Sequence, residues 1–84
     1  MDDLEFEPHA REEMASDAIS DDEVYHVVGD ADDVYERDDG RIRYEGLMED
    51  GRHLVVIVED ATRVVKTVWW DKRKSRRRRR RPRQ

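Results

Sequence analysis

The residues best suited to bind a ligand lie in the basic segment that closes the chain. Residues 72–84 contain ten Lys and Arg side chains and no acid. Cations at this density bind the phosphates of RNA or DNA without reading the base sequence, and the affinity falls steeply as salt rises. We expect nucleic acid to be bound by Lys72, Arg73, Lys74, Arg76, Arg77, Arg78, Arg79, Arg80, Arg81 and Arg83.

The rest of the chain carries the opposite charge. Residues 1–71 hold all 22 acids and only seven bases, a balance of −15, whereas residues 72–84 carry +10. Two other roles of the tail therefore stay open: neutralisation of this acidic body or self-association, and a solvated segment without a specific role. The acidity itself fits either a salt-rich cytoplasm or an acidic face that binds a partner.

His9 is a candidate for proton transfer. It follows Pro8 at the expected start of a helix, where the positive end of the helix dipole disfavours a protonated imidazole. The neutral ring can act as a base. It can equally cap the helix or pack on a sheet.

No cofactor or metal site is expected. The chain has no Cys, and His26 and His53 fall on separate elements without ligand spacing. The paired Asp residues do not match a calcium loop, and the sequence has neither a Gly-rich phosphate loop nor a nucleophile elbow.

Length and composition predict one small domain over residues 1–71 and a disordered Arg-rich tail over residues 72–84. No apolar run approaches the roughly 18 residues of a membrane span. The acidic first ten residues differ from a signal peptide. We therefore expect a cytoplasmic protein without a membrane partner.

Hydrophobic periodicity predicts a short strand followed by two helices. Leu4 and Phe6 alternate with acids in a strand that Pro8 ends, and apolar residues then recur at helical spacing. "SDDE" at 20–23 is a capping box that opens the second helix, for which Gly29 is a suitable end. The apolar helical positions are Ala10, Met14 and Ala18, then Val24, Val27 and Val28.

The second half of the chain predicts a meander of strands. Asp39-Gly40 suits a two-residue hairpin turn. "RHLVVIVE" and "TRVVKTVWW" follow as apolar strands that turn at Asp60-Ala61. The predicted fold is α+β, in the order β-α-α-β-β-β-β, with both helices on one face of a largely antiparallel sheet. The register expected of the first hairpin pairs Asp38 with Arg41, Glu36 with Arg43, and Tyr35 with Tyr44.

Trp69 and Trp70 place aromatic surface next to the tail. Strand alternation sends them to opposite faces of the sheet. One is expected to close the core. The other can cover the edge of the sheet or stack on unpaired bases.

The body resembles the domain-of-unknown-function family 4258 over roughly residues 4–70. The resemblance is carried by the spacing of the hairpins and by His9-Ala10, Met14, Ile19-Ser20 and Val24. The element order is similar to that of the RelE/ParE and BrnT-like toxins, whose RNA-cleaving members use basic residues and a Tyr or His on the sheet face. This similarity implies a RelE-like, toxin-like, RNA-directed protein, with ribonuclease activity as one form and an antitoxin protein as partner.

A ribonuclease of this kind neutralises charge on the phosphate and moves protons to and from the sugar oxygens. The resemblance assigns phosphate binding to Arg41 and Arg43, proton transfer to Tyr44 or His9, and electrostatic assistance to Lys66. The expected hairpin register pairs Arg41, Arg43 and Tyr44 with residues of the neighbouring strand, so a purely structural role for these three residues also stays open. Two other hypotheses are a non-catalytic binding module that joins unlike partners through its acidic body and basic tail, and a degenerate relative without activity.

Overall fold

The computed structural model describes residues 3–75, and the predicted order of elements is confirmed there. The short first strand ends before Pro8, which opens the first helix as expected of its fixed φ. The elements are β1 (Glu5–Phe6), α1 (Pro8–Asp17), α2 (Asp21–Gly29), β2 (Asp33–Glu36), β3 (Arg41–Leu47), β4 (His53–Glu59) and β5 (Val64–Trp70).

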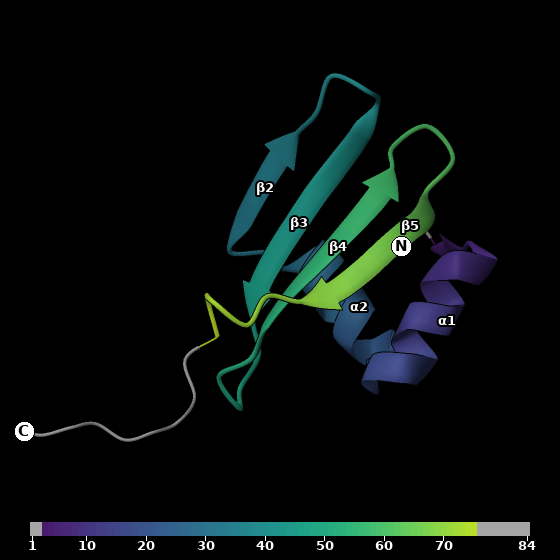
Figure 1. Cartoon of the computed structure of the whole chain (residues 1–84). Helices are drawn as coiled ribbons and strands as arrows, with labels where there is room; N and C mark the ends of the chain where they lie inside the picture. Colours follow the sequence, from purple (N-terminus) through teal and green to yellow (C-terminus); the bar gives the residue numbers. More distant parts are fainter. Residues whose placement is uncertain (1–2, 76–84) are drawn as a thin grey trace, which may run out of the picture.

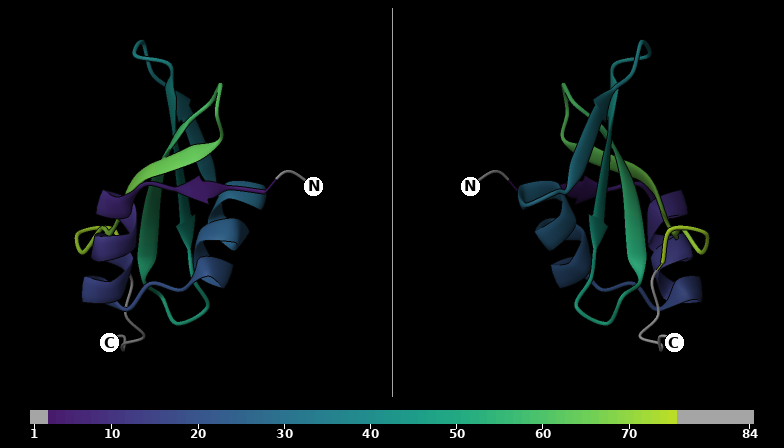
Figure 2. Two further views of the ribbon diagram at one scale, coloured as in Figure 1. Left: turned by 90° about the vertical axis from the view of Figure 1, so that its right-hand side faces the viewer. Right: turned by 90° about the vertical axis from the view of Figure 1, so that its left-hand side faces the viewer.

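The strands form one mixed sheet in the order β1-β5-β4-β3-β2. β1 runs parallel to β5, and the other neighbours are antiparallel. Helix α1 packs along β5, whereas α2 packs over β4 and β3 (Figures 1 and 2). The predicted α+β class, with helices on one face of the sheet, is confirmed. Neither helix of residues 3–75 is long and apolar enough to cross a membrane.

The core lies between the two helices and one face of the sheet. β4 is the central apolar strand, and its alternate residues Leu54, Val56 and Val58 contribute to the core. Ala10 and Met14 of α1 are buried there as predicted, whereas Ala18 lies at the end of that helix. The core also contains Leu4, Ile19, Val24, Val27, Val65 and Val68.

The predicted capping box of α2 is confirmed. The Ser20 hydroxyl accepts the Glu23 backbone N–H at 3.1 Å, and the Glu23 carboxylate accepts the Ser20 N–H at 2.9 Å. We expect Ser20→Ala to lower the free energy of unfolding by about 1 kcal/mol, because a helix N–H loses its acceptor. Urea unfolding measures this change. Ser16→Ala, at an exposed site inside α1, is the control, and equal losses in both variants would contradict the capping role.

The predicted register of the first hairpin is wrong by one residue. Tyr35 pairs with Arg43, and Glu36 pairs with Ile42. The loop contains three residues, 38–40, closed by a hydrogen bond from the Arg37 N–H to the Arg41 carbonyl. Gly40, at φ +83°, takes the left-handed position that ends such a loop. Because one step exchanges the faces of a strand, Tyr35 and Tyr44 lie on opposite faces and do not pair.

The second hairpin also differs from the prediction, since residues 60–63 rather than Asp60-Ala61 alone connect β4 to β5. The Arg63 N–H donates to the Glu59 carbonyl at 2.8 Å and closes this loop. Further along, Ile57 pairs with Thr67 but Val58 pairs with Val65. Lys66 is therefore the extra residue of a β-bulge, which redirects its side chain.

Candidate functional site

The face of the sheet without helices carries a group of ionisable side chains. Register and alternation place Arg43 and Glu45 of β3 on this helix-free face, together with His53 of β4. Glu45 is only 1% exposed and His53 8%. A buried carboxylate needs partners, because an unpaired charge is costly away from water. These partners define the site.

Three cationic or imidazole groups surround the Glu45 carboxylate. Nε2 of His53 lies 2.8 Å from Oε1 of Glu45, and Nζ of Lys74 donates to the same oxygen at 3.0 Å. Nε of Arg43 donates to Oε2. Burial by itself raises the pKa of Glu45, but the hydrogen bonds from His53, Lys74 and Arg43 together lower it to about 2. Glu45 is therefore ionised and fixes the two cations in place.

Residues 71–75 fold back onto the same face. The Asp71 N–H donates to the His53 carbonyl at 2.8 Å, and the Ser75 hydroxyl accepts the His53 N–H at 2.9 Å. The ion pair between Glu45 and Lys74 also raises the pKa of Lys74. Lys74, which the sequence assigned to the tail, thus contacts the domain. Lys72 and Arg73 are exposed in the same segment, and the predicted Arg76, Arg77, Arg78, Arg79, Arg80, Arg81 and Arg83 lie outside the described residues.

An arginine and a tryptophan cross the middle of this face. The Arg43 guanidinium lies 5.4 Å from the centre of the Trp69 ring, in a contact that reaches from β3 to β5 over β4. Val55 and Ile57 of β4 lie beneath it and are 0% and 1% exposed, although no helix of residues 3–75 covers them. Arg43 therefore shields apolar residues from water and also carries a charge on the surface.

A hollow of about 500 Å³ opens beside the Glu45 cluster. One wall is the edge strand β2, with Tyr35 at 47% exposure. The floor is the ionised Glu45, and cations from three different segments face the opening. The lining residues are Tyr35, Arg37, Arg43, Glu45 and Lys74.

The structure does not bring the five predicted catalytic residues together. His9 is exposed on α1, where its Nε2 lies 3.3 Å from Oε2 of Glu13, one helical turn further along. Lys66 projects from the bulge of β5, and its ammonium lies 2.6 Å from the Glu7 carboxylate. Both residues belong to the β1–α1 side of the molecule, at the opposite edge of the sheet from β2.

The remaining three predicted residues are divided between the faces of β3. Arg43 lies on the helix-free face, whereas Tyr44 packs against the core and accepts a 3.5 Å hydrogen bond from Arg63. Arg41 begins β3, and its N–H donates to the Asp39 carboxylate at 3.1 Å. Arg41 was expected to pair with Asp38 and Arg43 with Glu36. Instead, the Arg41 backbone contacts Asp39 and the Arg43 side chain contacts Glu45. Of the five, only Arg43 lines the hollow.

The two tryptophans lie on opposite faces, as predicted. Trp70 packs on the core and donates from its indole N–H to the Asp17 carbonyl at 3.0 Å. The Arg52 guanidinium stacks on its other side, 3.9 Å from the ring centre. Trp69 is therefore the tryptophan that stays next to the charged site.

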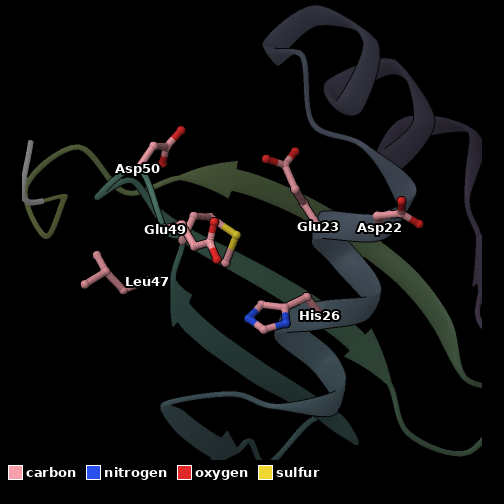
Figure 3. A pocket seen from close by; sticks show the side chains of 7 residues that line it. Asp22, Glu23, His26, Leu47, Glu49 and Asp50 are labelled. Atoms are coloured by element: carbon pink, nitrogen blue, oxygen red, sulfur yellow. The ribbon is translucent and has the colours of Figure 1, made fainter.

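A second hollow has the opposite charge. It lies between α2 and the β3–β4 loop, and its acidic residues come from both segments (Figure 3). Phosphate would be repelled there. Among residues 3–75, no group of three His, Asp or Glu side chains is arranged to hold a metal ion. The lining residues are Asp22, Glu23, His26, Leu47, Met48, Glu49 and Asp50.

Sequence reasoning missed Glu45 and His53, the two buried ionisable residues within the described range 3–75. Arg43 and Glu45 stand two apart in a strand, which is a usable signal because such residues share a face. His53 directly precedes an apolar run, so its burial was also indicated. The contact with Lys74 joins residues 29 positions apart and had no local signal.

The fold and the site define a small α+β domain that is helical on one face and has an ionised, partly aromatic hollow on the other. The chain belongs to the family described as "Domain of unknown function (DUF4258)", whose family model matches residues 6–70. This match confirms the resemblance to that family, while the likeness to RelE-type toxins stays a prediction. No curated protein and no solved structure matches the chain.

Proposed function

We propose that this protein is a nucleic-acid-binding module that holds the phosphate backbone on its helix-free face. The observation that carries the proposal is the convergence of Arg37, Arg43 and Lys74 on one hollow. These side chains are 44%, 33% and 50% exposed, so each can reach a ligand. The basic tail begins directly after this site, and it adds affinity without base specificity.

The distribution of charge favours this face over the other. The helices α1 and α2 contain six acids and one base, Arg11. A polyanion is repelled by that layer and attracted to the face with the cationic hollow. The negative charge of the body therefore orients the nucleic acid instead of preventing its binding. The six acids are Glu12, Glu13, Asp17, Asp21, Asp22 and Glu23.

The positions of the predicted catalytic residues support binding over cleavage. General acid–base catalysis requires the acid, the base and the phosphate ligand within reach of one phosphodiester. His9 and Lys66 lie at the β1 side, and Tyr44 faces the core. We therefore propose a non-catalytic role, and a gel assay of RNA integrity in the presence of the full chain tests it. Appearance of cleavage products that depend on Arg43 would overturn the non-catalytic assignment.

We expect Arg37→Glu to weaken binding of a single-stranded RNA 12-mer about five- to tenfold at 50 mM salt. The reversed charge faces the hollow, and the slope of log K against log salt is expected to fall by about 0.7. Arg37 is exposed and its ion pair with Asp39 is superficial, so folding should be unaffected. Fluorescence anisotropy with a labelled RNA measures both quantities.

Arg11→Glu is the matched control, because Arg11 is equally exposed and also pairs with an aspartate. It lies on α1, away from the hollow. The proposal predicts a clearly smaller effect than that of Arg37→Glu. Equal weakening by both variants would mean that only net charge matters and that the helix-free face is not the site.

A further inference from the structure

We infer that the hollow of the helix-free face holds one unpaired nucleotide of a single strand, with its base against Tyr35 and its phosphate among Arg37, Arg43 and Lys74. This inference rests on the proposed function and narrows it from nucleic acid in general to strands with accessible bases. Three observations support it: the exposed ring of Tyr35, the net charge of the hollow, and the hydrogen bonds by which Glu45 fixes Arg43 and Lys74.

Tyr35 supplies a stacking surface that a base can reach. It lies on β2, the edge strand of the sheet, and is 47% exposed, so a ligand can reach its ring. Its strand neighbour Arg43 is one of the cations of the hollow. Aromatic residues on an open sheet face commonly stack unpaired bases while nearby cations hold the backbone.

The charge balance fits a single phosphodiester. The three cations and the ionised Glu45 sum to two positive charges, and Asp39, which pairs with Arg37, lowers the local balance to one. One phosphodiester, with its single negative charge, neutralises this remainder, whereas several neighbouring phosphates would not be neutralised. The tail remains available for the rest of the strand.

Glu45 makes the site ready before the ligand arrives. Its carboxylate accepts hydrogen bonds from Arg43 and Lys74, and Nε2 of the buried His53 also contacts that carboxylate. Long cationic side chains otherwise lose conformational freedom on binding, so their fixation reduces that cost. Glu45 is thus a positioning residue and does not itself contact the phosphate.

A duplex does not fit this arrangement. Its bases are stacked inside the helix and offer no free ring face to Tyr35, so a duplex would use only the cations and the tail. The hollow has the size of a small-molecule pocket, about 500 Å³, which suits one nucleotide. Preference for single strands over duplexes at equal phosphate number is therefore the signature of the inferred site.

The experiment compares three probes on the full-length chain by anisotropy competition at 100 mM salt. The probes are a 12-nucleotide oligouridine, the same backbone with abasic sugars, and a blunt-ended RNA duplex of equal phosphate number. Wild-type protein is expected to bind oligouridine about tenfold more tightly than either competitor. Tyr35→Ala is expected to remove this preference, and Tyr35→Phe to retain it because the ring face is kept.

Val34→Ala is the matched control for Tyr35→Ala. Val34 is the neighbouring residue of β2, is also exposed at 54%, and points to the other face. It should leave the preference intact, and thermal unfolding of each variant shows that it is folded. Since Tyr35 lies at an exposed edge, its replacement should not prevent folding.

The possible results separate the inference from the proposed function. If all three probes bind equally and Tyr35→Ala changes nothing, the nucleotide site is wrong while backbone binding on this face stands. If no probe binds, or if binding is insensitive to Arg37→Glu, the proposed function itself fails. A preference for oligouridine that survives Tyr35→Ala would also overturn the inference, because another surface would then read the base.

Discussion

Glu45→Gln is expected to lower the free energy of unfolding by about 3 kcal/mol at pH 7. The change retains the shape of the side chain but removes the charge that Arg43, Lys74 and His53 share. A fall in the pKa of Glu45 from 4.5 to about 2 corresponds to roughly this energy, at about 1.4 kcal/mol per pH unit. Loss of one partner from a buried ionic cluster has a cost of the same order. Urea unfolding at pH 7 measures it.

The dependence on pH identifies the carboxylate as the cause. Because the folded-state pKa of Glu45 is depressed, its stabilisation is fully present above the unfolded value of about 4.5 and is lost as the pH falls through about 2. The difference in stability between wild type and Glu45→Gln should therefore be constant near neutrality. It should shrink between about pH 4.5 and pH 2. A constant difference across this range would show that packing, and not charge, explains the loss.

Glu36→Gln provides the comparison. Glu36 is an exposed residue of β2, and its replacement removes the same charge from the same acidic body. Its effect should stay within about 0.5 kcal/mol. If both variants lose equal stability, the ionic cluster around Glu45 contributes no more to the free energy of unfolding than an exposed acid does.

The order of the elements was predictable because the signals were local. A capping box, Pro8 at a helix start and the apolar runs of β4 and β5 each act within a few residues. The register of the first hairpin was not predictable in the same way. Asp39-Gly40 suits a two-residue turn and also the end of a three-residue loop, and only the pairing in the whole sheet decides between them.

The site was less predictable than the fold, for a physical reason. Arg43 was identified because a cation on a strand is visible in the sequence, but its partner was taken from the wrong register. Glu45 looked like one acid among 22, and its only local signal is its position two residues from Arg43 on the same face of a strand. Its importance arises from burial on the helix-free face and from Lys74, which only the tertiary structure supplies.

A chain that ends at Ser75 is expected to lose most of its affinity for single-stranded RNA at low salt. The truncation removes seven arginines, at positions 76–81 and 83, while retaining Lys74 and Ser75 in their contacts with Glu45 and His53. Each phosphate contact on a single strand contributes about 0.7 to the slope of log K against log salt. Seven contacts add a loss of roughly 10³-fold between 50 and 200 mM salt, so the full chain should lose roughly 10⁴-fold in affinity, against about tenfold for the truncated chain.

Replacement of the seven arginines by lysines is the control for this truncation. It retains the charge and should retain the salt slope, because counterion release depends on the number of charges and not on the guanidinium group. An unchanged slope after truncation would mean that the tail does not contact the phosphates. Tighter RNA binding by the truncated chain would contradict the prediction, because the tail would then oppose RNA binding instead of adding to it. Anisotropy titrations at four salt concentrations separate these outcomes.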